Sequence, residues 1–138
     1  MPVSGIDYGR KRIGLAISEG DQAYPVGTIE RRSLLRDLEL IRTQLAGRDV
    51  SLIVVGLPIN MDGSEGPSAA SARAFGERLA AATGIAVEMY DERLTTVEAL
   101  DRLRDASISR AKRKSLRDAM AATVMLQGWL DARRSNSR

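Results

Sequence analysis

The sequence predicts an α/β fold in which one mixed five-stranded sheet is flanked by helices. Three observations support this prediction: strand-like runs open the chain, strand-like and helix-like segments then alternate, and 138 residues suit one domain. A hairpin meander that leads into strand–helix–strand units gives a sheet with both antiparallel and parallel pairs. We therefore expect residues 1–138 to form a single domain.

The first third of the chain is predicted to form three strands. Short apolar runs at residues 3–7 and 13–18 are separated by a basic, glycine-containing turn at residues 8–12. Two strands joined in this way are typical of an antiparallel hairpin. A third strand is expected at residues 24–29, which would extend the hairpin into a meander.

The next segment changes from the strand pattern to the helix pattern. Over residues 34–45, apolar side chains recur every three or four positions, as on one face of a helix. Ser33 precedes this segment as a favoured N-cap, and Gly47 follows it as a favoured helix end. The β-branched run at residues 52–56 is typical of a parallel strand that is buried on both faces.

The remaining elements continue the alternation. An Ala-rich helix is predicted at residues 68–83, and a last strand is predicted at residues 85–90. Residues 95–98 have the pattern of a capping box, which would begin a further helix. The final helix is expected at residues 115–132, and the tail at residues 133–138 is expected to fray.

Composition excludes several classes of chemistry. The chain contains no cysteine and no histidine. Disulfides, thiolate metal sites, cysteine nucleophiles, imidazole bases and serine–histidine–aspartate triads are therefore ruled out. Hydrolytic chemistry would have to rely on carboxylates, hydroxyls, lysine, arginine, tyrosine or a metal with oxygen ligands.

Charge is moderately basic overall and strongly basic near the C-terminal third. The chain has 21 basic and 18 acidic residues, a net charge of +3, and an isoelectric point near 9.7. Residues 102–117 contain seven basic side chains and one acid, Asp105. Such a block can neutralise phosphates, although a solvated loop and helix face would explain it equally well.

Nothing in the sequence indicates a membrane protein. No apolar run approaches the roughly 20 residues that a membrane-spanning helix needs. Residues 1–5 lack the charged, apolar and small-residue regions of a secretion signal. We therefore expect a cytoplasmic protein with no membrane partner.

Carboxylates follow two of the predicted strands and open the final helix. Asp7 ends the first strand, Asp91 and Glu92 follow the last strand, and Asp118 lies in the first turn of the last helix. Ligands of open α/β sheets bind beyond the carboxyl ends of the strands, so these acids could meet there. Converging carboxylates repel one another, and a divalent cation with a preference for oxygen, Mg²⁺ or Mn²⁺, would relieve that conflict. Paired metals can activate water and stabilise the leaving oxygen of a phosphodiester.

Each acid also has an ordinary structural explanation. Asp118 and Ser115 fit a capping pattern at a helix start. Asp7 could be a turn residue before a glycine. Asp91 or Glu92 could pair with Arg93 at the surface. Spacing alone permits these acids to converge but does not bring them together.

Four segments carry a resemblance to a known family. They are GIDYGRKRIGLA at residues 5–16, VVGLPINMDGSE at residues 54–65, DERLTTVEA at residues 91–99 and DAMAA at residues 118–122. Together and in this order they resemble the motifs of the YqgF/RuvX family of pre-16S rRNA nucleases, also described as Holliday junction resolvase-like. The second and third segments are specific, whereas an Asp-x-Gly turn like that of the first also begins the phosphate loop of actin-like ATPases.

The resemblance implies an RNase H-like fold and a divalent-metal nuclease. Carried over by motif, the catalytic and metal-binding acids are Asp7, Glu92 and Asp118, with Asp91 as the alternate to Glu92. Because neighbouring residues of a strand point to opposite faces, only one of Asp91 and Glu92 should face the metals. The resemblance also implies ribosome biogenesis, in which the nuclease would mature the 5′ end of the small-subunit rRNA.

Basic side chains are the candidates for nucleic-acid binding. The predicted set is Lys11, Arg12, Arg93, Arg110, Lys112, Arg113 and Lys114. Few aromatic residues are present, so recognition by backbone and shape is expected rather than by base stacking. The expected partner is an rRNA precursor, with branched or single-stranded DNA as alternatives.

Three other functions remain open at this point. One is an ATPase, which the turn from Asp7 to Gly9 permits, although 138 residues is short for the two-domain clamp that such ATPases use. A resolvase of branched DNA needs two active sites related by symmetry and would be favoured by an obligate dimer, whereas a monomer would favour the RNA nuclease. A module that binds nucleic acid without cutting it would show salt-sensitive binding but no metal-dependent product. The sequence itself allows either a monomer or a homodimer.

Overall fold

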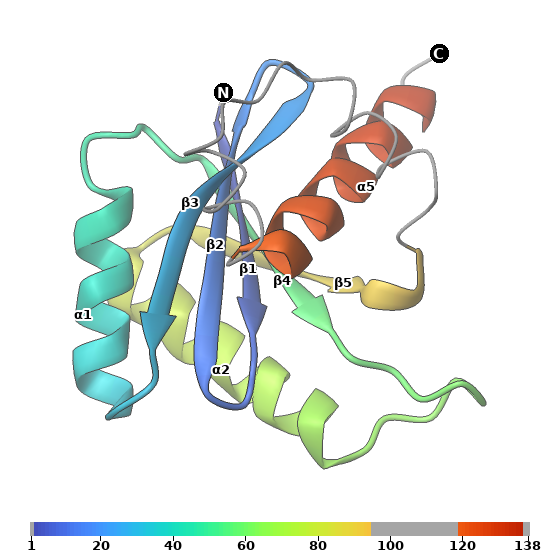
Figure 1. The fold of residues 1–138 in the computed structure, drawn as a ribbon, viewed down its shortest axis with the longest axis horizontal. Helices are drawn as coiled ribbons and strands as arrows, with labels where there is room; N and C mark the ends of the chain where they lie inside the picture. Colours follow the sequence, from blue (N-terminus) through green and yellow to red (C-terminus); the bar gives the residue numbers. More distant parts are fainter. Residues whose placement is uncertain (1, 95–118, 137–138) are drawn as a thin grey trace.

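One sheet of five strands crosses the molecule, with helices on both of its faces (Figure 1). The computed structural model describes residues 2–94 and 119–136. The strands are β1 (Val3–Tyr8), β2 (Arg12–Glu19), β3 (Gln22–Glu30), β4 (Leu52–Leu57) and β5 (Ala86–Asp91). Their order across the sheet is β3-β2-β1-β4-β5, which confirms the predicted mixed five-stranded sheet.

Strand β1 is central and has one antiparallel and one parallel neighbour. It pairs antiparallel with β2, where Asp7 lies opposite Gly14, and parallel with β4. Strand β5 pairs parallel with β4, and β3 pairs antiparallel with β2 to complete the meander. The carboxyl ends of β1, β4 and β5 therefore meet at one edge of the sheet, where α/β sheets commonly bind ligands.

Two helices cover one face of the sheet. They are α1 (Leu34–Leu45) and α2 (Pro67–Thr83). The Ser33 hydroxyl accepts a hydrogen bond from the Arg36 amide at 3.3 Å, so the predicted N-cap of α1 is confirmed. The first turn of α2 contains a proline, which suits a helix start because backbone N–H groups in the first turn have no partner within the helix. Apolar residues of β1, β2 and β4 pack beneath these helices in the larger core cluster.

Among the described helices, α5 (Met120–Asn136) is the one that covers the opposite face, as Figure 1 shows. It packs on β1 at Gly5, where a Cβ atom would lie 2.7 Å from the Leu126 Cβ. The absence of a side chain at Gly5 therefore lets the helix approach the central strand closely. Gln127 also fixes the helix to the β2–β3 hairpin, because its amide accepts from the Ala23 amide at 2.8 Å and donates to the Asp21 carbonyl at 2.9 Å.

The predicted and observed boundaries differ by small amounts. Strand β3 is longer than the predicted 24–29, and α2 begins at Pro67 rather than residue 68. Helix α5 continues to Asn136, into the tail for which fraying was predicted. The helix predicted from residues 95–98 and the start of the one predicted from residue 115 lie outside the described residues. Among the residues that the structure describes, no helix combines the length and the apolar character that crossing a bilayer requires.

Candidate active site

Asp7 lies at the carboxyl end of the central strand and on the face that α5 covers. Side chains alternate along a strand, so Asp7 shares a face with Val3 and Gly5. Val3 belongs to the core cluster formed with α5, and Gly5 lies directly against Leu126. Asp7 itself is half-buried. The strand therefore holds a carboxylate at the open end of the sheet, where the apolar core stops.

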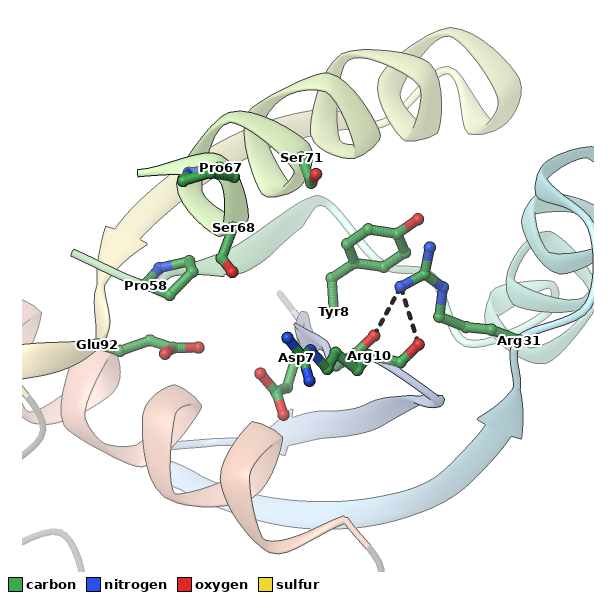
Figure 2. A pocket seen from close by; sticks show the side chains of 10 residues that line it. Asp7, Tyr8, Arg10, Arg31, Pro58, Pro67, Ser68, Ser71 and Glu92 are labelled. Carbon is green, nitrogen blue, oxygen red and sulfur yellow. Dashed lines mark hydrogen bonds between the residues drawn. The ribbon is translucent and has the colours of Figure 1, made fainter. Parts of the chain in front are cut away.

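Glu92 comes from the far side of β4 and reaches the same place. It begins the short 3-10 helix η1 (Glu92–Leu94), directly after β5. Strand β4 separates β5 from β1, so the Glu92 side chain must pass over β4 to approach Asp7. Gly56 makes this passage possible, because a Cβ atom there would lie 3.1 Å from both Cγ and Cδ of Glu92. Figure 2 shows the Glu92 carboxylate directed toward Asp7.

The surroundings of Glu92 favour its protonated form. Burial, followed by the charge of Asp7, a hydrogen bond with Asp7 and the charge of Asp91, raises the pKa of Glu92 from its ordinary 4.5 to about 7. Near neutral pH, Glu92 therefore holds a proton for a substantial part of the time. A cation that bound both groups would displace that proton and remove the repulsion.

Asp91 is held away from Asp7 by an arginine. Its Oδ2 atom lies 2.9 Å from Nη2 of Arg93, and its Oδ1 atom accepts the Arg93 backbone N–H at 2.9 Å. These hydrogen bonds lower the pKa of Asp91, so its carboxylate stays ionised and paired. Arg93 also reaches the carbonyl oxygen of Asn60 at 3.4 Å, which connects η1 to the β4–α2 loop. Of the two neighbouring acids, the structure brings Glu92 to Asp7 and pairs Asp91 with Arg93.

The third predicted acid, Asp118, lies outside the described residues. Ala119, the residue after it, is described and buried. Its Cα atom would lie 3.8 Å from a Cβ atom at Gly14, the residue opposite Asp7 on β2. Residues 2–94 and 119–136 contain no group of three acidic, histidine or cysteine side chains that could hold a metal. The described donors are thus two carboxylates, whose oxygen atoms suit a hard divalent cation.

A cavity of about 420 Å³ opens at this edge of the sheet. Its lining residues are Asp7, Tyr8, Gly9, Arg10, Arg31, Pro58, Pro67, Ser68, Ser71 and Glu92. Alternation along β1 directs Asp7 to the α5 face and Tyr8 to the α2 face, so the cavity extends around the carboxyl edge from one face to the other. Acidic groups therefore line one side of it, and arginines and serine hydroxyls contribute to the rest (Figure 2).

The basic residues in the cavity differ from those predicted. Lys11 in the β1–β2 turn and Arg12 at the start of β2 are exposed but do not line the cavity, whereas Arg10 and Arg31 do. Arg31 carries no signal in the sequence, because only the return of β3 alongside the β1–β2 turn brings it there. Arg93, also predicted to bind phosphates, pairs with Asp91 and does not line the cavity. The remaining predicted residues, Arg110, Lys112, Arg113 and Lys114, lie outside the described residues.

Solved structures share this fold over nearly the whole chain. The structure titled "T. thermophilus RuvC in complex with Holliday junction substrate" aligns with a TM-score of 0.65 at 18% identity, covering 97% of this chain and 96% of that chain. The fowlpox virus Holliday junction resolvase aligns with a TM-score of 0.56 at 12% identity, covering 96% and 99%. These similarities confirm the predicted RNase H-like fold.

Other relatives share a much higher sequence identity with this chain than these structures do. A protein of Anaeromyxobacter sp. (strain Fw109-5) named "Putative pre-16S rRNA nuclease" is 50% identical over 135 residues, covering 96% of this chain and 98% of the relative. One of Myxococcus xanthus (strain DK1622) with the same name is 46% identical over 136 residues, covering 97% and 90%. The family model described as "RuvX: Holliday junction resolvase" matches residues 1–132. The chain therefore belongs to the RuvX family, and the prediction of a nuclease, a hydrolase of phosphodiester bonds, is confirmed.

Proposed function

We propose that this chain is a divalent-metal-dependent nuclease that cuts the precursor of 16S rRNA in the cytoplasm, with residues 1–138 acting as one catalytic domain. The observation that carries the proposal is the meeting of Asp7 and Glu92 at the carboxyl edge of the sheet, across Gly56. The choice of substrate is supported by relatives of up to 50% identity that are named after pre-16S rRNA.

Asp7 and Glu92 are proposed as ligands of the cation, with Asp118 as the third. Support for Asp118 comes from its neighbour Ala119, which lies beside the cross-strand partner of Asp7. A divalent cation, Mg²⁺ or Mn²⁺, supplies a Lewis acid for the phosphodiester and lowers the pKa of water. The raised pKa of Glu92 means that one proton leaves the pair when both carboxylates serve as ligands.

The other side chains have positioning roles in this proposal. Strand β1 is fixed between β2 and β4, so Asp7 is held on a rigid element. The ion pair with Arg93 keeps Asp91 out of the site and connects η1 to the loop that follows β4. Basic groups beyond the acids neutralise backbone phosphates and set the position of the strand to be cut.

Cleavage by an Asp7→Asn variant tests the proposal. Wild type, Asp7→Asn and the control Asp49→Asn are compared on an rRNA precursor fragment, with Mg²⁺, with Mn²⁺ and with EDTA. Asp49 is an exposed acid distant from the cavity lining and has a φ of 60°, which asparagine also accepts. We expect Asp7→Asn to lose more than about a hundredfold in rate, since even a partner of a metal ligand is worth ~10–100-fold. Cleavage at the wild-type rate by Asp7→Asn would reject the site.

A second candidate function is the resolution of branched DNA. The description of the matching family as a Holliday junction resolvase favours it. A four-way DNA junction and a single-stranded DNA, added as substrates to the same assay, separate the two functions. Light scattering gives the oligomeric state of the protein. A dimer that cuts the junction symmetrically and gives no product from rRNA precursor would favour the resolvase.

A further inference from the structure

Arg31 lies in the cavity as the residue that follows strand β3. Its backbone N–H donates to the Lys11 carbonyl at 2.8 Å. Its Nη1 group donates to the carbonyls of Gly9 and Arg10, at 3.0 and 3.1 Å. The two Nη1 contacts, drawn as dashed lines in Figure 2, fix the guanidinium beside the β1–β2 turn. The arginine is therefore held in one place before any ligand arrives.

An aromatic stack holds the same guanidinium from its flat side. The rings of Tyr8 and Phe75 are parallel, with centroids 4.0 Å apart and an interplanar angle of 9°. The Arg31 guanidinium carbon lies over the Tyr8 ring, 4.1 Å from its centroid. Because Phe75 occupies one face of Tyr8, Arg31 occupies the other. Tyr8 therefore has no free face on which a base could stack, and it acts as a platform for the arginine.

The charge of Arg31 is not neutralised by the part of the chain that is described. Within residues 2–94 and 119–136, no carboxylate forms an ion pair with Arg31, and its Nε and Nη2 groups make no hydrogen bond. A guanidinium with a free edge of N–H groups matches the two oxygens of a phosphate. By contrast, its neighbour Arg32 lies 3.7 Å from the Glu30 carboxylate and does not line the cavity.

We propose that Arg31 binds a backbone phosphate of the nucleic-acid strand that is being cut, adjacent to the phosphodiester held at Asp7 and Glu92. This inference rests on the proposed nuclease function and names where the substrate lies. The strand would cross the carboxyl edge of the sheet, from the α5 face at the acids to the α2 face at Arg31. A phosphate is common to RNA and DNA, so this contact gives position and affinity rather than a choice of base.

A purely structural role would make Arg31 a clamp for the β1–β2 turn. In that case, its replacement would lower the stability of the fold, but the dependence of binding on salt would stay the same. Loss of a phosphate contact instead lowers the slope of log K against log salt, by about 0.7 for one contact to a single strand. The salt slope therefore distinguishes the two roles.

The experiment compares Arg31→Gln, Arg31→Lys and the matched control Arg32→Gln, each in an Asp7→Asn background and in EDTA. Binding of a fluorescent single-stranded rRNA-precursor oligonucleotide is measured by anisotropy over a series of NaCl concentrations, with a DNA oligonucleotide of the same sequence as a second arm. We expect Arg31→Gln to weaken binding about tenfold and to lower the slope by about 0.7. Arg31→Lys should keep the slope, and Arg32→Gln should leave both quantities nearly unchanged.

Kinetics with otherwise wild-type protein gives a second measurement. A phosphate contact away from the reacting atoms acts equally on bound substrate and transition state, so Arg31→Gln should raise KM about tenfold with little change in kcat. Equal effects on RNA and DNA would identify the phosphate as the group that Arg31 contacts. An effect on RNA alone would identify the 2′-hydroxyl instead and would overturn the proposal.

The outcomes separate this inference from the proposed function. Cleavage by wild type, with the same salt slope in Arg31→Gln and Arg32→Gln, overturns the role of Arg31 and leaves the nuclease intact. Weakened binding by Arg31→Gln in a protein that does not cleave supports the phosphate contact and overturns the nuclease. A wild-type protein that binds neither RNA nor DNA overturns both.

Discussion

Replacing Glu92 with glutamine should stabilise the metal-free protein at alkaline pH while abolishing its activity. The pKa of Glu92 is raised in the folded protein, from 4.5 to about 7. An acid with a raised pKa binds its proton more tightly in the folded state than in the unfolded state. Its ionisation therefore costs stability progressively as the pH rises from about 4.5 to 7, and the cost is complete above that range.

The size of the effect follows from the pKa and the exposure of the side chain. Taken in full, a rise from 4.5 to about 7 would correspond to about 3 kcal/mol. Glu92 is only half-buried, so solvent screens the repulsion from Asp7. We therefore expect Glu92→Gln to raise the free energy of unfolding by about 1–2 kcal/mol near pH 8, and by a smaller amount near pH 5.

Urea denaturation in EDTA at both pH values measures this difference. Glu19→Gln serves as the control, because Glu19 is an exposed acid at the end of β2 and outside the cavity. It removes the same charge without relieving Asp7. The reasoning fails if Glu92→Gln is no more stable than wild type at pH 8, or if its gain is the same at pH 5 and in the Glu19 control.

Two further predictions concern the glycines that bring the site together. In Gly56→Ala, the added Cβ atom would lie 3.1 Å from Cγ and Cδ of Glu92 and displace that side chain. We expect cleavage to fall at least about tenfold and the pKa of Glu92, followed by NMR, to return toward its ordinary value. Unchanged cleavage would contradict this prediction. Gly5→Ala should lower the free energy of unfolding in urea by about 1–3 kcal/mol, because its Cβ would lie 2.7 Å from the Leu126 Cβ and overpack the contact between α5 and β1. Wild-type stability in Gly5→Ala would show that the helix can move away freely.

The elements of the fold were predictable because their signals are local. The β-branched run at residues 52–56 became β4, with Ile53, Val54 and Val55 fully buried. The N-cap at Ser33 was recognisable because capping is a contact between residues three positions apart. Prediction was weaker at the end of the chain, where the helix expected to end at residue 132 continues to Asn136. A helical spacing gives the apolar face of a helix but not how far the sheet beneath it extends.

The site was harder to predict from the sequence, because its contacts join residues far apart in the chain. Nothing in the spacing of Asp7 and Glu92 shows that they meet, and only the resemblance to family motifs paired them. The choice between Asp91 and Glu92 depends on the ion pair with Arg93, which lies two residues from Asp91 and was considered equally for both acids. Arg31 was missed entirely, because its place depends on the register of the β2–β3 pair.

The glycines of the family motifs explain why so small a sheet can hold this site. Glu92 belongs to the segment after β5, and Asp7 belongs to β1, with the whole of β4 between them. Any side chain at Gly56 would occupy the space that Glu92 crosses, and any side chain at Gly5 would move α5 away from β1. The motif glycines, which carry no functional group, therefore determine how closely the carboxylates of the other motif residues approach one another. Burial and the nearby charge of Asp7 raise the pKa of Glu92, and its ionisation therefore costs stability. The same glycines that permit the site thus also impose its energetic cost. In the proposed site, a cation bound by both carboxylates would relieve that cost, so metal affinity would depend on the backbone geometry at Gly56.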